Sequence, residues 1–574
     1  MKKIILCILL ISIPYLSDAV GMLRKVPPKN MLLQQRQSIS GQKNTPWLSA
    51  FDNLHTTLRY EYAFTHWKKI DWSALSAEFR PRIETTEAAN DSAAYFLALR
   101  EYIFSIPDGH MELLPNSQKA WDLIERLMQE QIGGSYGLAL IGLDDGRVVA
   151  SIITDSGPAN NAGMQIGAEI LEWNGESIES ALENVSEIWA YNPGATNEVR
   201  RLNQYRFIGR APVGSTTHVT FKNPGQTAVI TATLTAIDDH FETYWLTHFY
   251  PTAEDLEERV QYTIFESGYG YVKVTSEGFS AHTNRSVKDK FREAIQTFVN
   301  HDVPAVILDF RHNAGGTDEV AAYISGFFYD SPALYEHIAY FDRTTLTFEI
   351  VNTLLIEPQS PYFGGRVVAM VGPGGISSGE GPPMAIQKLP QGQVISFYAS
   401  NGSFGMAAGR FNMPCDLSVT YTNGRSLDRD HNIQIDSDAN LNGGVRPDIR
   451  VPLNQQTVHQ AFAEGKDVEL LYVIDHLNQL TRVDEMGIQD HLPTYLLQNY
   501  PNPFNNETII RFQIPRNQNA CLEIVDTLGR QIDVFDITNK ESVKWNPKNQ
   551  ANGIYLYRIK TDSYIEIKKM TLLR

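Results

Sequence analysis

The sequence predicts a multidomain α/β protein with four parts: a helical segment, a small β module, an α/β core and an all-β module at the C-terminal end. Three observations support this prediction. The chain has 574 residues, which is too long for one hydrophobic core. After about residue 238, strands alternate with helices, as in an α/β core. Short alternating strands dominate residues 136–234 and those after 495, as in small β domains.

Composition and charge narrow the function classes. The chain is 43% hydrophobic and 20% charged, which is ordinary for globular protein, and its net charge of -17 argues against nucleic acid or an anionic membrane as a partner. Of its three cysteines, Cys7 lies in the leader, and Cys415 and Cys521 lie in different predicted domains. We therefore expect neither a disulfide nor a cysteine-based zinc site.

Residues 1–19 have the pattern of a secretory signal peptide. Two lysines precede the apolar run 4–15, and cleavage is expected near Ala19. No later apolar run is long enough to span a bilayer, so the sequence predicts no transmembrane segment in the mature chain.

The next part, residues 42–120, is predicted to be a helical domain. Between Trp47 and Leu114 the apolar residues recur at helical spacing. The segment Pro107-Asp108-Gly109-His110 places a histidine at the junction of a loop and a strand. This histidine could cap a helix from a turn, or its ring could face a cleft, and the local sequence leaves both readings open.

Residues 124–237 are predicted to form a small β-barrel module. The stretch Ser156–Glu176 contains a turn, a short helix with Ala-Gly and a strand that ends in Asn-Gly, and in this order it resembles a PDZ domain. The resemblance implies that Tyr136, Gly137, Leu138 and Ala139 form a loop whose amides bind the C-terminal carboxylate of a peptide, which adds to the sheet as a strand. The alternative is a β-barrel without a ligand. Residues 183–212 are expected to be an insertion before the last strands.

The predicted α/β core, residues 238–477, contains two turns of small residues, each between a strand and a helix. In the turn 370–380, Ser377 stands where a strand end and a helix N-terminus would expose a hydroxyl beside free amides, which suits a nucleophile. In the turn 311–317, glycines precede a helix without the Gly-Lys-Ser/Thr ending of a phosphate loop. Its free amides could equally hold an oxyanion.

Together the two turns resemble those of the C-terminal-processing and tricorn-type serine peptidases. The stretch Asp309–Gly316 matches the family's Asp-Leu-Arg-x-Asn-x-Gly-Gly strand end, and Ser377–Glu380 matches its Ser-Ala-Gly-Glu nucleophile turn. The resemblance implies that Ser377 is the nucleophile and that the amides of Gly316 and Ser378 form the oxyanion hole. It implies no cofactor and no metal. The run 436–442 also does not fit a calcium loop, because Leu441 stands where such a loop needs glycine.

The family uses two kinds of catalytic base. In the Ser/Lys scheme a lysine follows the next strand, but Met406 stands there, and Lys388 lies about three turns along the helix after the nucleophile. The tricorn-like branch takes its base from an Asp-Gly-His segment before the PDZ module, which His110 matches. The resemblance therefore implies that His110 is the general base, a role that an imidazole pKa near 6.5 suits.

The group that orients His110 is less well defined by the sequence. The branch carries a glutamate just before a Gly-Val-x-Pro-Asp segment, where this chain has Asn442. An amide oxygen at Asn442 could orient the imidazole. Asp436, Asp438 and Glu112 stay open as alternatives.

A polar linker is expected at residues 478–494, followed by a β-sandwich at 495–574. The motifs Asn-Tyr-Pro-Asn-Pro-Phe at 499–504, Gly-Ile-Tyr at 553–555 and Lys-Lys-Met at 568–570 resemble the C-terminal sorting domain of the type IX secretion system. The resemblance implies export through the periplasm to the outside or the outer-membrane surface of a Gram-negative, Bacteroidetes-like bacterium. An adhesive or carbohydrate-binding sandwich is the alternative.

These expectations combine into a secreted or cell-surface serine endopeptidase that cleaves unfolded or extended polypeptides, with a substrate held by its C-terminus and the type IX machinery as partner. The alternative is a peptide-binding surface protein on the same fold that has lost its catalytic base.

Overall fold

The computed structural model describes residues 46–249, 255, 257–278 and 286–485, followed by 495–496, 499, 501–514, 520–538, 540, 542–548, 550–561 and 565–573. The chain divides into two compact units, Met1–Glu469 and Leu470–Arg574. The predicted signal peptide at residues 1–19 lies outside the described residues. Among the helices of the described ranges, none combines the length and apolar character that a membrane span requires.

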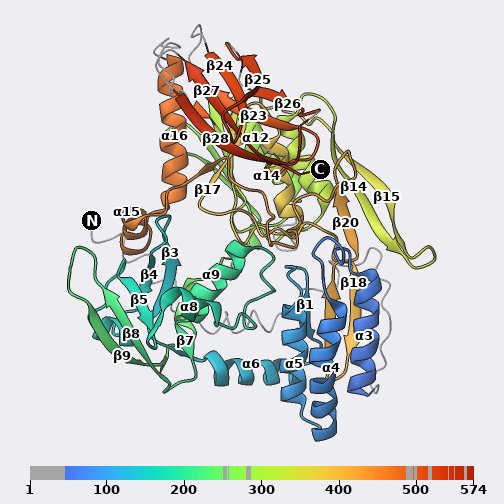
Figure 1. Ribbon diagram of the computed structural model, residues 1–574, viewed down its shortest axis with the longest axis vertical. Coiled ribbons are helices and arrows are strands. Elements are labelled where there is room, and N and C mark those ends of the chain that lie inside the picture. The colour runs from blue at the N-terminus through green and yellow to red at the C-terminus, as the bar shows by residue number, and fades with distance from the viewer. Residues whose placement is uncertain are drawn as a thin grey trace. The chain divides into compact units, whose positions relative to one another are not determined.

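Three helices pack side by side at the start of the first unit (Figure 1): α3 (Trp47–Glu61), α4 (Trp72–Ala89) and α5 (Ser92–Phe104). Aspartate caps begin two of them, since Asp71 accepts from the amide of Ala74 at 2.9 Å and Asp91 from two amides at 3.0 Å. Such caps satisfy amides that a helix start leaves unpaired. The helices bury an apolar face made of Phe51, Leu54, Leu58, Tyr95, Leu99 and Tyr102.

Strands from two distant parts of the chain complete this N-terminal core. The strand β1 (Glu112–Pro115) pairs with β19 (Leu417–Tyr421), which pairs with β18 (Gly409–Met413). Leu417 and Val419 belong to the same buried cluster as the helices. The helices thus share one core with strands of the α/β core region, residues 238–477, and β1 ties the His110 loop to that region.

The β module is an open sheet with the order β3-β4-β5-β8-β9, in which β6 (Glu176–Ser177) pairs only with β5. Three short helices accompany it: α7 (Pro158–Asn161), α8 (Ile178–Glu183) and α9 (Asn197–Phe207). The expected insertion at 183–212 contains α9. The strands are β3 (Leu138–Gly142), β4 (Val148–Ile153), β5 (Glu169–Trp173), β8 (Thr216–Lys222) and β9 (Ile230–Thr235).

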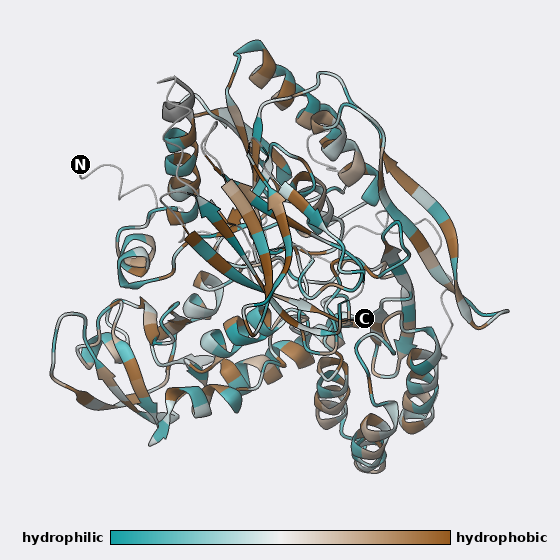
Figure 2. Cartoon of the chain, turned by 45° about the horizontal axis from the view of Figure 1, so that its top comes forward, coloured by the Kyte–Doolittle hydropathy of each residue, from teal (hydrophilic) through white to brown (hydrophobic). Residues whose placement is uncertain are grey.

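The α/β core region is built on a six-stranded sheet of order β11-β12-β13-β16-β17-β21. All neighbouring strands except β11 and β12 run parallel. The central strands β13 and β16 consist mainly of buried apolar residues, as expected of a parallel sheet that is covered on both faces. Figure 2 colours the whole chain by hydropathy and shows hydrophobic residues in many of its strands. The strands are β11 (Val260–Ile264), β12 (Gly270–Val274), β13 (Ala305–Asp309), β16 (Arg366–Met370), β17 (Gly392–Ser396) and β21 (Ile449–Arg450).

The helices of this region are α12 (Val287–Asn300), α13 (Asp318–Ser325) and α14 (Gly381–Gln387). Because β13 and β16 are parallel neighbours, with Asp309 opposite Met370, the turns that follow them leave the sheet at the same edge. The strand order therefore brings together the two turns that the sequence singled out.

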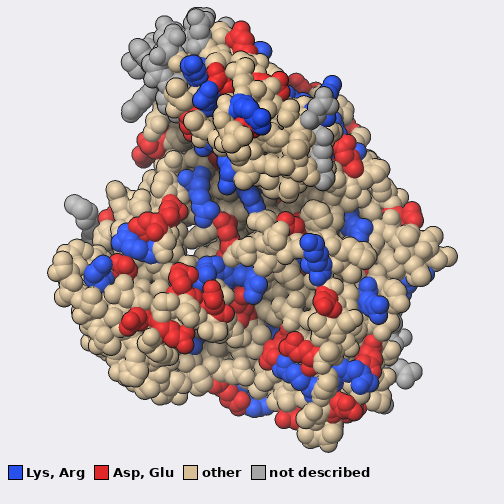
Figure 3. Space-filling model, viewed as in Figure 1, with Lys and Arg blue, Asp and Glu red and all other residues tan. Residues whose placement is uncertain are grey.

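The α/β core region contains a second sheet, with the order β15-β14-β20. Its strands are β14 (Ala333–Asp342), β15 (Thr347–Ile356) and β20 (Gly424–Leu427). On the face of the molecule seen in Figure 3, acidic and basic side chains are interspersed.

The C-terminal unit is all-β after its first helix, as predicted. Two sheets, β22-β23-β26 and β25-β24-β27-β28, enclose one apolar core that includes Leu522, Trp545 and Tyr557. The helix α16 (Val468–Glu485) runs into the segment expected to be a linker, whose residues 486–494 lie outside the described ranges. The strands are β22 (Tyr495–Leu496), β23 (Thr508–Gln513), β24 (Ala520–Asp526), β25 (Gln531–Asp536), β26 (Ser542–Trp545), β27 (Gly553–Thr561) and β28 (Ile565–Leu572).

Candidate active site

Ser377 stands on a strained turn between β16 and α14. Its φ is +59°, in the left-handed region that residues with a Cβ seldom adopt. Such a conformation costs about 1–3 kcal/mol and is typical of functional turns. Ser377 is partly exposed, whereas the residues on either side of it are buried. The turn therefore presents one hydroxyl outward from a packed core, as a nucleophile elbow does.

The turn after β13 lies directly against this serine. Gly315 has a φ of +78°, and a Cβ built on it would lie 2.6 Å from Cβ and 3.3 Å from Oγ of Ser377. In the part of the chain that the structure describes, the amides of Gly316 and Ser378 donate to no acceptor. The structure thus brings Ser377, Gly316 and Ser378 together, with two amides available for a ligand.

We predict that Gly315→Ala lowers both stability and activity. The left-handed φ alone costs about 1–2 kcal/mol. The contact would also displace Ser377, the predicted nucleophile, which we expect to lower kcat about 10²-fold. The matched control is Gly268→Ala, because Gly268 has a φ of +84° but nothing within 4 Å of an added Cβ. Thermal unfolding and kcat of both variants test this, and equal activities in the two variants would contradict it.

The loop that carries His110 is anchored to the nucleophile turn by one residue, Ser403. Its Oγ accepts from the amide of Gly109 at 2.8 Å, and its carbonyl oxygen accepts from the amide of Ser377 at 2.9 Å. Gly109 also lies against Ile376, since an added Cβ would be 2.7 Å from Cδ1 of that residue. The histidine loop and the nucleophile turn are therefore packed together. Among the contacts of the described residues, no direct hydrogen bond joins the two side chains, and in unliganded enzymes such bonds are often long.

The carboxylate beside the imidazole is Asp108. Its Oδ2 accepts from the hydroxyls of Tyr62 at 3.0 Å and Thr422 at 2.9 Å, and its Oδ1 accepts from the amide of His110 at 2.9 Å. Nδ1 of His110 lies 3.8 Å from this Oδ1 and is buried without a hydrogen-bond partner. Three donors thus fix a buried carboxylate next to the ring. Sequence reasoning missed Asp108, although its position two residues before His110 was visible.

The orienting residues named from the sequence lie elsewhere. Asn442 is exposed, and its Oδ1 accepts from Nη2 of Arg446 at 3.2 Å. Asp436 is buried, but its Oδ1 accepts from the amides of Phe404 and Gly405. Oε2 of Glu112 accepts from the hydroxyl of Thr420 at 3.2 Å. Among the contacts of the described residues, Asp108 lies beside the ring and Asn442 makes no contact with it, so the orienting role becomes a proposal for Asp108 in place of Asn442.

A buried lysine stands beside the histidine loop. Nζ of Lys68 donates to Oγ of Ser437 at 2.6 Å and to the carbonyl of Pro107 at 2.7 Å. Burial lowers the pKa of Lys68, and nearby carboxylates oppose that shift. Burial also lowers the pKa of His110 below 6.5, an effect that Asp108 opposes and Lys68 reinforces. The imidazole is therefore neutral near pH 7, the state in which it can accept a proton.

Lys388, the lysine that the sequence offers on the helix after Ser377, has a partner other than Ser377. It is the C-terminal cap residue of α14, and its Nζ lies 3.5 Å from Oε1 of Gln434. This agrees with the expectation that Lys388 does not face Ser377.

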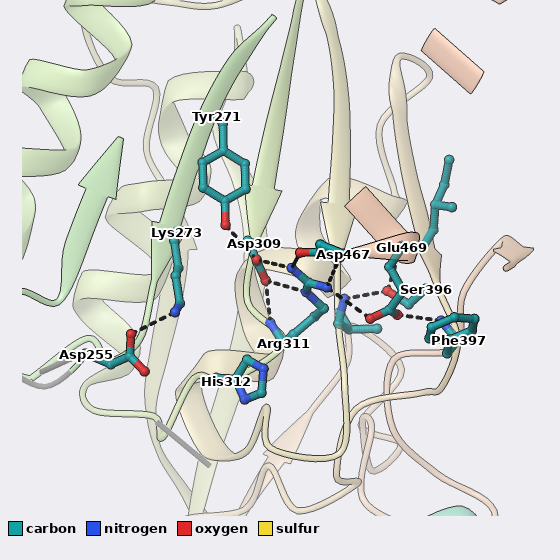
Figure 4. Close-up of polar contacts among 12 residues, drawn as sticks. Asp255, Tyr271, Lys273, Asp309, Arg311, His312, Ser396, Phe397, Asp467 and Glu469 are labelled. Atoms are coloured by element: carbon teal, nitrogen blue, oxygen red, sulfur yellow. Dashed lines mark hydrogen bonds and ion pairs between the residues drawn. The ribbon is translucent and has the colours of Figure 1, made fainter. Parts of the chain in front are cut away.

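Arg311 fixes the end of β13 through ion pairs with three carboxylates (Figure 4). Its guanidinium contacts Asp309 at 2.7 Å, Asp467 at 2.7 Å and Glu469 at 3.1 Å. The hydroxyl of Tyr271 also donates to Asp309, at 2.8 Å. Although burial opposes it, Arg311 lowers the pKa of Asp309. The strand that leads into the Asn313–Gly316 turn is thus held by a planar, fully paired guanidinium.

The segment predicted to bind a peptide carboxylate is partly engaged by the chain itself. The amide of Tyr136 donates to the carbonyl of Gly209 at 2.9 Å, and that of Gly137 to Oγ of Ser135 at 3.0 Å. Leu138 and Ala139 belong to β3, which pairs with β4 on one side and forms the edge of its sheet. Two of the four expected amides are therefore already satisfied.

Comparison with known families identifies the class of protein. Residues 268–451 match peptidase family S41, and residues 498–572 match the secretion system C-terminal sorting domain. The chain is thus a serine-type peptidase with an S41 peptidase domain and a type IX sorting domain. The sorting domain marks it for secretion or for the cell surface of a Bacteroidetes-like bacterium.

Two solved structures of mature CPAF have a similar fold. The structure of mature CPAF complexed with lactacystin is 12% identical in sequence to this chain, and its TM-score is 0.52. The match covers 76% of this chain and 98% of the CPAF chain. A second structure of mature CPAF is 13% identical, with 75% and 97% covered and a TM-score of 0.51. The photosystem II D1 C-terminal processing protease is 16% identical, with 74% and 99% covered and a TM-score of 0.35. The comparison with curated proteins gave no match.

Proposed function

We propose that this protein is an endopeptidase that cleaves unfolded or extended polypeptides, with Ser377 as nucleophile and His110 as general base. The observation that carries the proposal is the double anchor at Ser403, which packs the His110 loop against the strained Ser377 turn. Asp108 supports it as the group that orients the imidazole, as the third member of a catalytic triad does.

In the proposed reaction, Oγ of Ser377 attacks the carbonyl carbon of the scissile bond, and His110 takes the hydroxyl proton. The carbonyl oxygen becomes an oxyanion that accepts from the amides of Gly316 and Ser378. His110 then gives the proton to the leaving amine, and the C–N bond breaks to leave an acyl-enzyme. A water molecule, deprotonated by His110, hydrolyses the ester and restores Ser377.

The β module is proposed to resemble a PDZ domain and to contact the substrate through the edge strand β3. We assign carboxylate binding to neither Tyr136 nor Gly137, because their amides already donate within the chain. Export is proposed to begin at the N-terminal signal and to pass through the periplasm before the sorting domain acts.

Cleavage of one protein in two states tests the substrate class. We expect a fluorescently labelled protein to be hydrolysed when reduced and alkylated, and at least about tenfold more slowly when folded, because only an extended chain fits a nucleophile fixed on a rigid turn. Binding of the unfolded protein without any cleavage would support the alternative, an inactive peptide-binding protein.

A further inference from the structure

The loop that follows β12, residues 275–278, lies beneath the turn that carries the Gly316 amide. Oγ of Ser276 donates to the carbonyl oxygen of Gly315 at 2.7 Å, and the amide of Glu277 donates to the same oxygen at 3.1 Å. Both lone pairs of this carbonyl are therefore used. Arg259 and the amide of Gly278 donate in turn to Oγ of Ser276, at 3.2 and 3.0 Å, which fixes the hydroxyl.

These contacts determine the direction of one amide. A trans peptide is planar, with its C=O and N–H pointing to opposite sides. Because the carbonyl of Gly315 is held by Ser276 and Glu277, the N–H of Gly316 points away from that loop. A rotated peptide would place the carbonyl where an oxyanion must bind and would remove its donor. The peptide needs holding because Gly315 is a glycine at a φ of +78°, a residue with many accessible conformations.

The side chain of Glu277 ties this turn to the residue after the nucleophile. Its Oε1 accepts from Nδ2 of Asn313 at 2.8 Å, and its Oε2 accepts from the hydroxyl of Ser378 at 3.3 Å. Oδ1 of Asn313 in turn accepts from the amide of Gly315 at 2.8 Å. Glu277, Asn313 and Ser378 are all at most 1% exposed. One carboxylate thus spans both halves of the proposed oxyanion hole.

We infer that Glu277 and Ser276 are positioning residues, which hold the Gly315–Gly316 peptide so that the Gly316 amide is available to the reaction at Ser377. This inference rests on the proposed function. Neither side chain touches the reacting atoms, so both act through the orientation of a backbone amide.

The carboxylate of Glu277 accepts two hydrogen bonds, so the orientation that it maintains should depend on its protonation state and therefore on pH. Burial raises the pKa of Glu277 to about 7, although the hydrogen bond from Asn313 favours the ionised form. As pH falls through this range, the carboxyl becomes protonated and loses one acceptor. The charged or titratable groups that face Glu277 are Arg259 near β11, Asp318 at the start of α13 and Tyr335 on β14.

The experiment measures kcat and KM against pH for wild type, Glu277→Gln, Glu277→Ala and Ser276→Ala, with an unstructured peptide as substrate. We expect Glu277→Ala to lower kcat about 10²-fold with KM nearly unchanged, and Ser276→Ala about tenfold, because a misaligned oxyanion donor costs up to about 10³-fold. Glutamine keeps an acceptor for Asn313 at every pH. Glu277→Gln should therefore keep most of kcat near pH 8. It should move the acid limb of the kcat–pH profile, the fall in kcat at low pH, from about 7 to below 6.5, because only His110 then titrates there.

Asp318→Asn is the control, because burial raises the pKa of Asp318 to about 7 as well. The charge of Asp318 contributes less than burial does to the raised pKa of Glu277, so this variant should lower the acid limb of the kcat profile by less than Glu277→Gln does. Full kcat in Ser276→Ala together with an unshifted acid limb in Glu277→Gln would overturn the inference even if Glu277→Ala does not fold. A failure of the proposed function is distinguishable, since it would appear as retained turnover in Ser377→Ala.

Discussion

Replacing Ser377 by alanine is expected to lower kcat/KM for an unfolded polypeptide by about 10⁴–10⁶-fold, because the acyl-enzyme can then not form. The substitution should leave the fold intact and the backbone strain unchanged, since alanine keeps the Cβ that makes a φ of +59° unfavourable for serine. The measurement is hydrolysis of a quenched fluorescent polypeptide, together with thermal unfolding to verify the fold.

The matched control for this substitution is Ser325→Ala. Ser325 is a fully buried serine of the same domain, and its hydroxyl donates to the carbonyl of Ala321 at 2.9 Å within α13. We expect this control to keep full activity. Turnover above about a tenth of the wild-type rate in Ser377→Ala would show that another group attacks the substrate.

Removal of the proposed base should have the second-largest effect. We expect His110→Ala to lower kcat about 10⁴-fold, because the hydroxyl of Ser377 then has no acceptor for its proton. Asp108→Asn should lower kcat by about 10²–10⁴-fold, since an amide orients the ring but does not stabilise the imidazolium as a carboxylate does.

The control for this pair is Asn442→Ala, which removes the residue that the sequence offered as the orienting group. Its amide oxygen accepts from Arg446 at the surface, so we expect a change of no more than about twofold, as is usual for exposed side chains. Steady-state kinetics of the three variants decide the assignment. A larger loss in Asn442→Ala than in Asp108→Asn would restore the assignment made from the sequence.

Local patterns were sufficient to predict the elements of the α/β core. The run 305–308 is continuously apolar and is followed by Asp-Phe-Arg, and the structure has β13 at 305–309. The apolar residues of 287–299 recur at helical spacing, and this segment lies in α12, which ends at Asn300. Such segments carry their own periodicity, so their type does not depend on distant contacts.

The sequence could not predict which side chains form hydrogen bonds across distant parts of the chain, because tertiary packing determines those pairs. Lys68, Asp108 and Ser437 lie far apart in the chain, yet Lys68 donates to Ser437 and to the carbonyl of Pro107. The same holds for Glu277, whose partners Asn313 and Ser378 follow two other strands. Asn442 was chosen from its spacing to a motif, and spacing along the chain does not determine which side chain reaches an imidazole.

The nucleophile assignment is tested most directly by labelling the folded mature chain, with its sorting domain retained, with a fluorophosphonate and locating the adduct by mass spectrometry. The reagent reports an activated serine without requiring knowledge of the natural substrate. We predict a single adduct on Ser377 that His110→Ala slows by at least about 10²-fold, because the unactivated hydroxyl is a weak nucleophile. A folded chain that takes no label at Ser377, or that is labelled at another serine, would contradict the account.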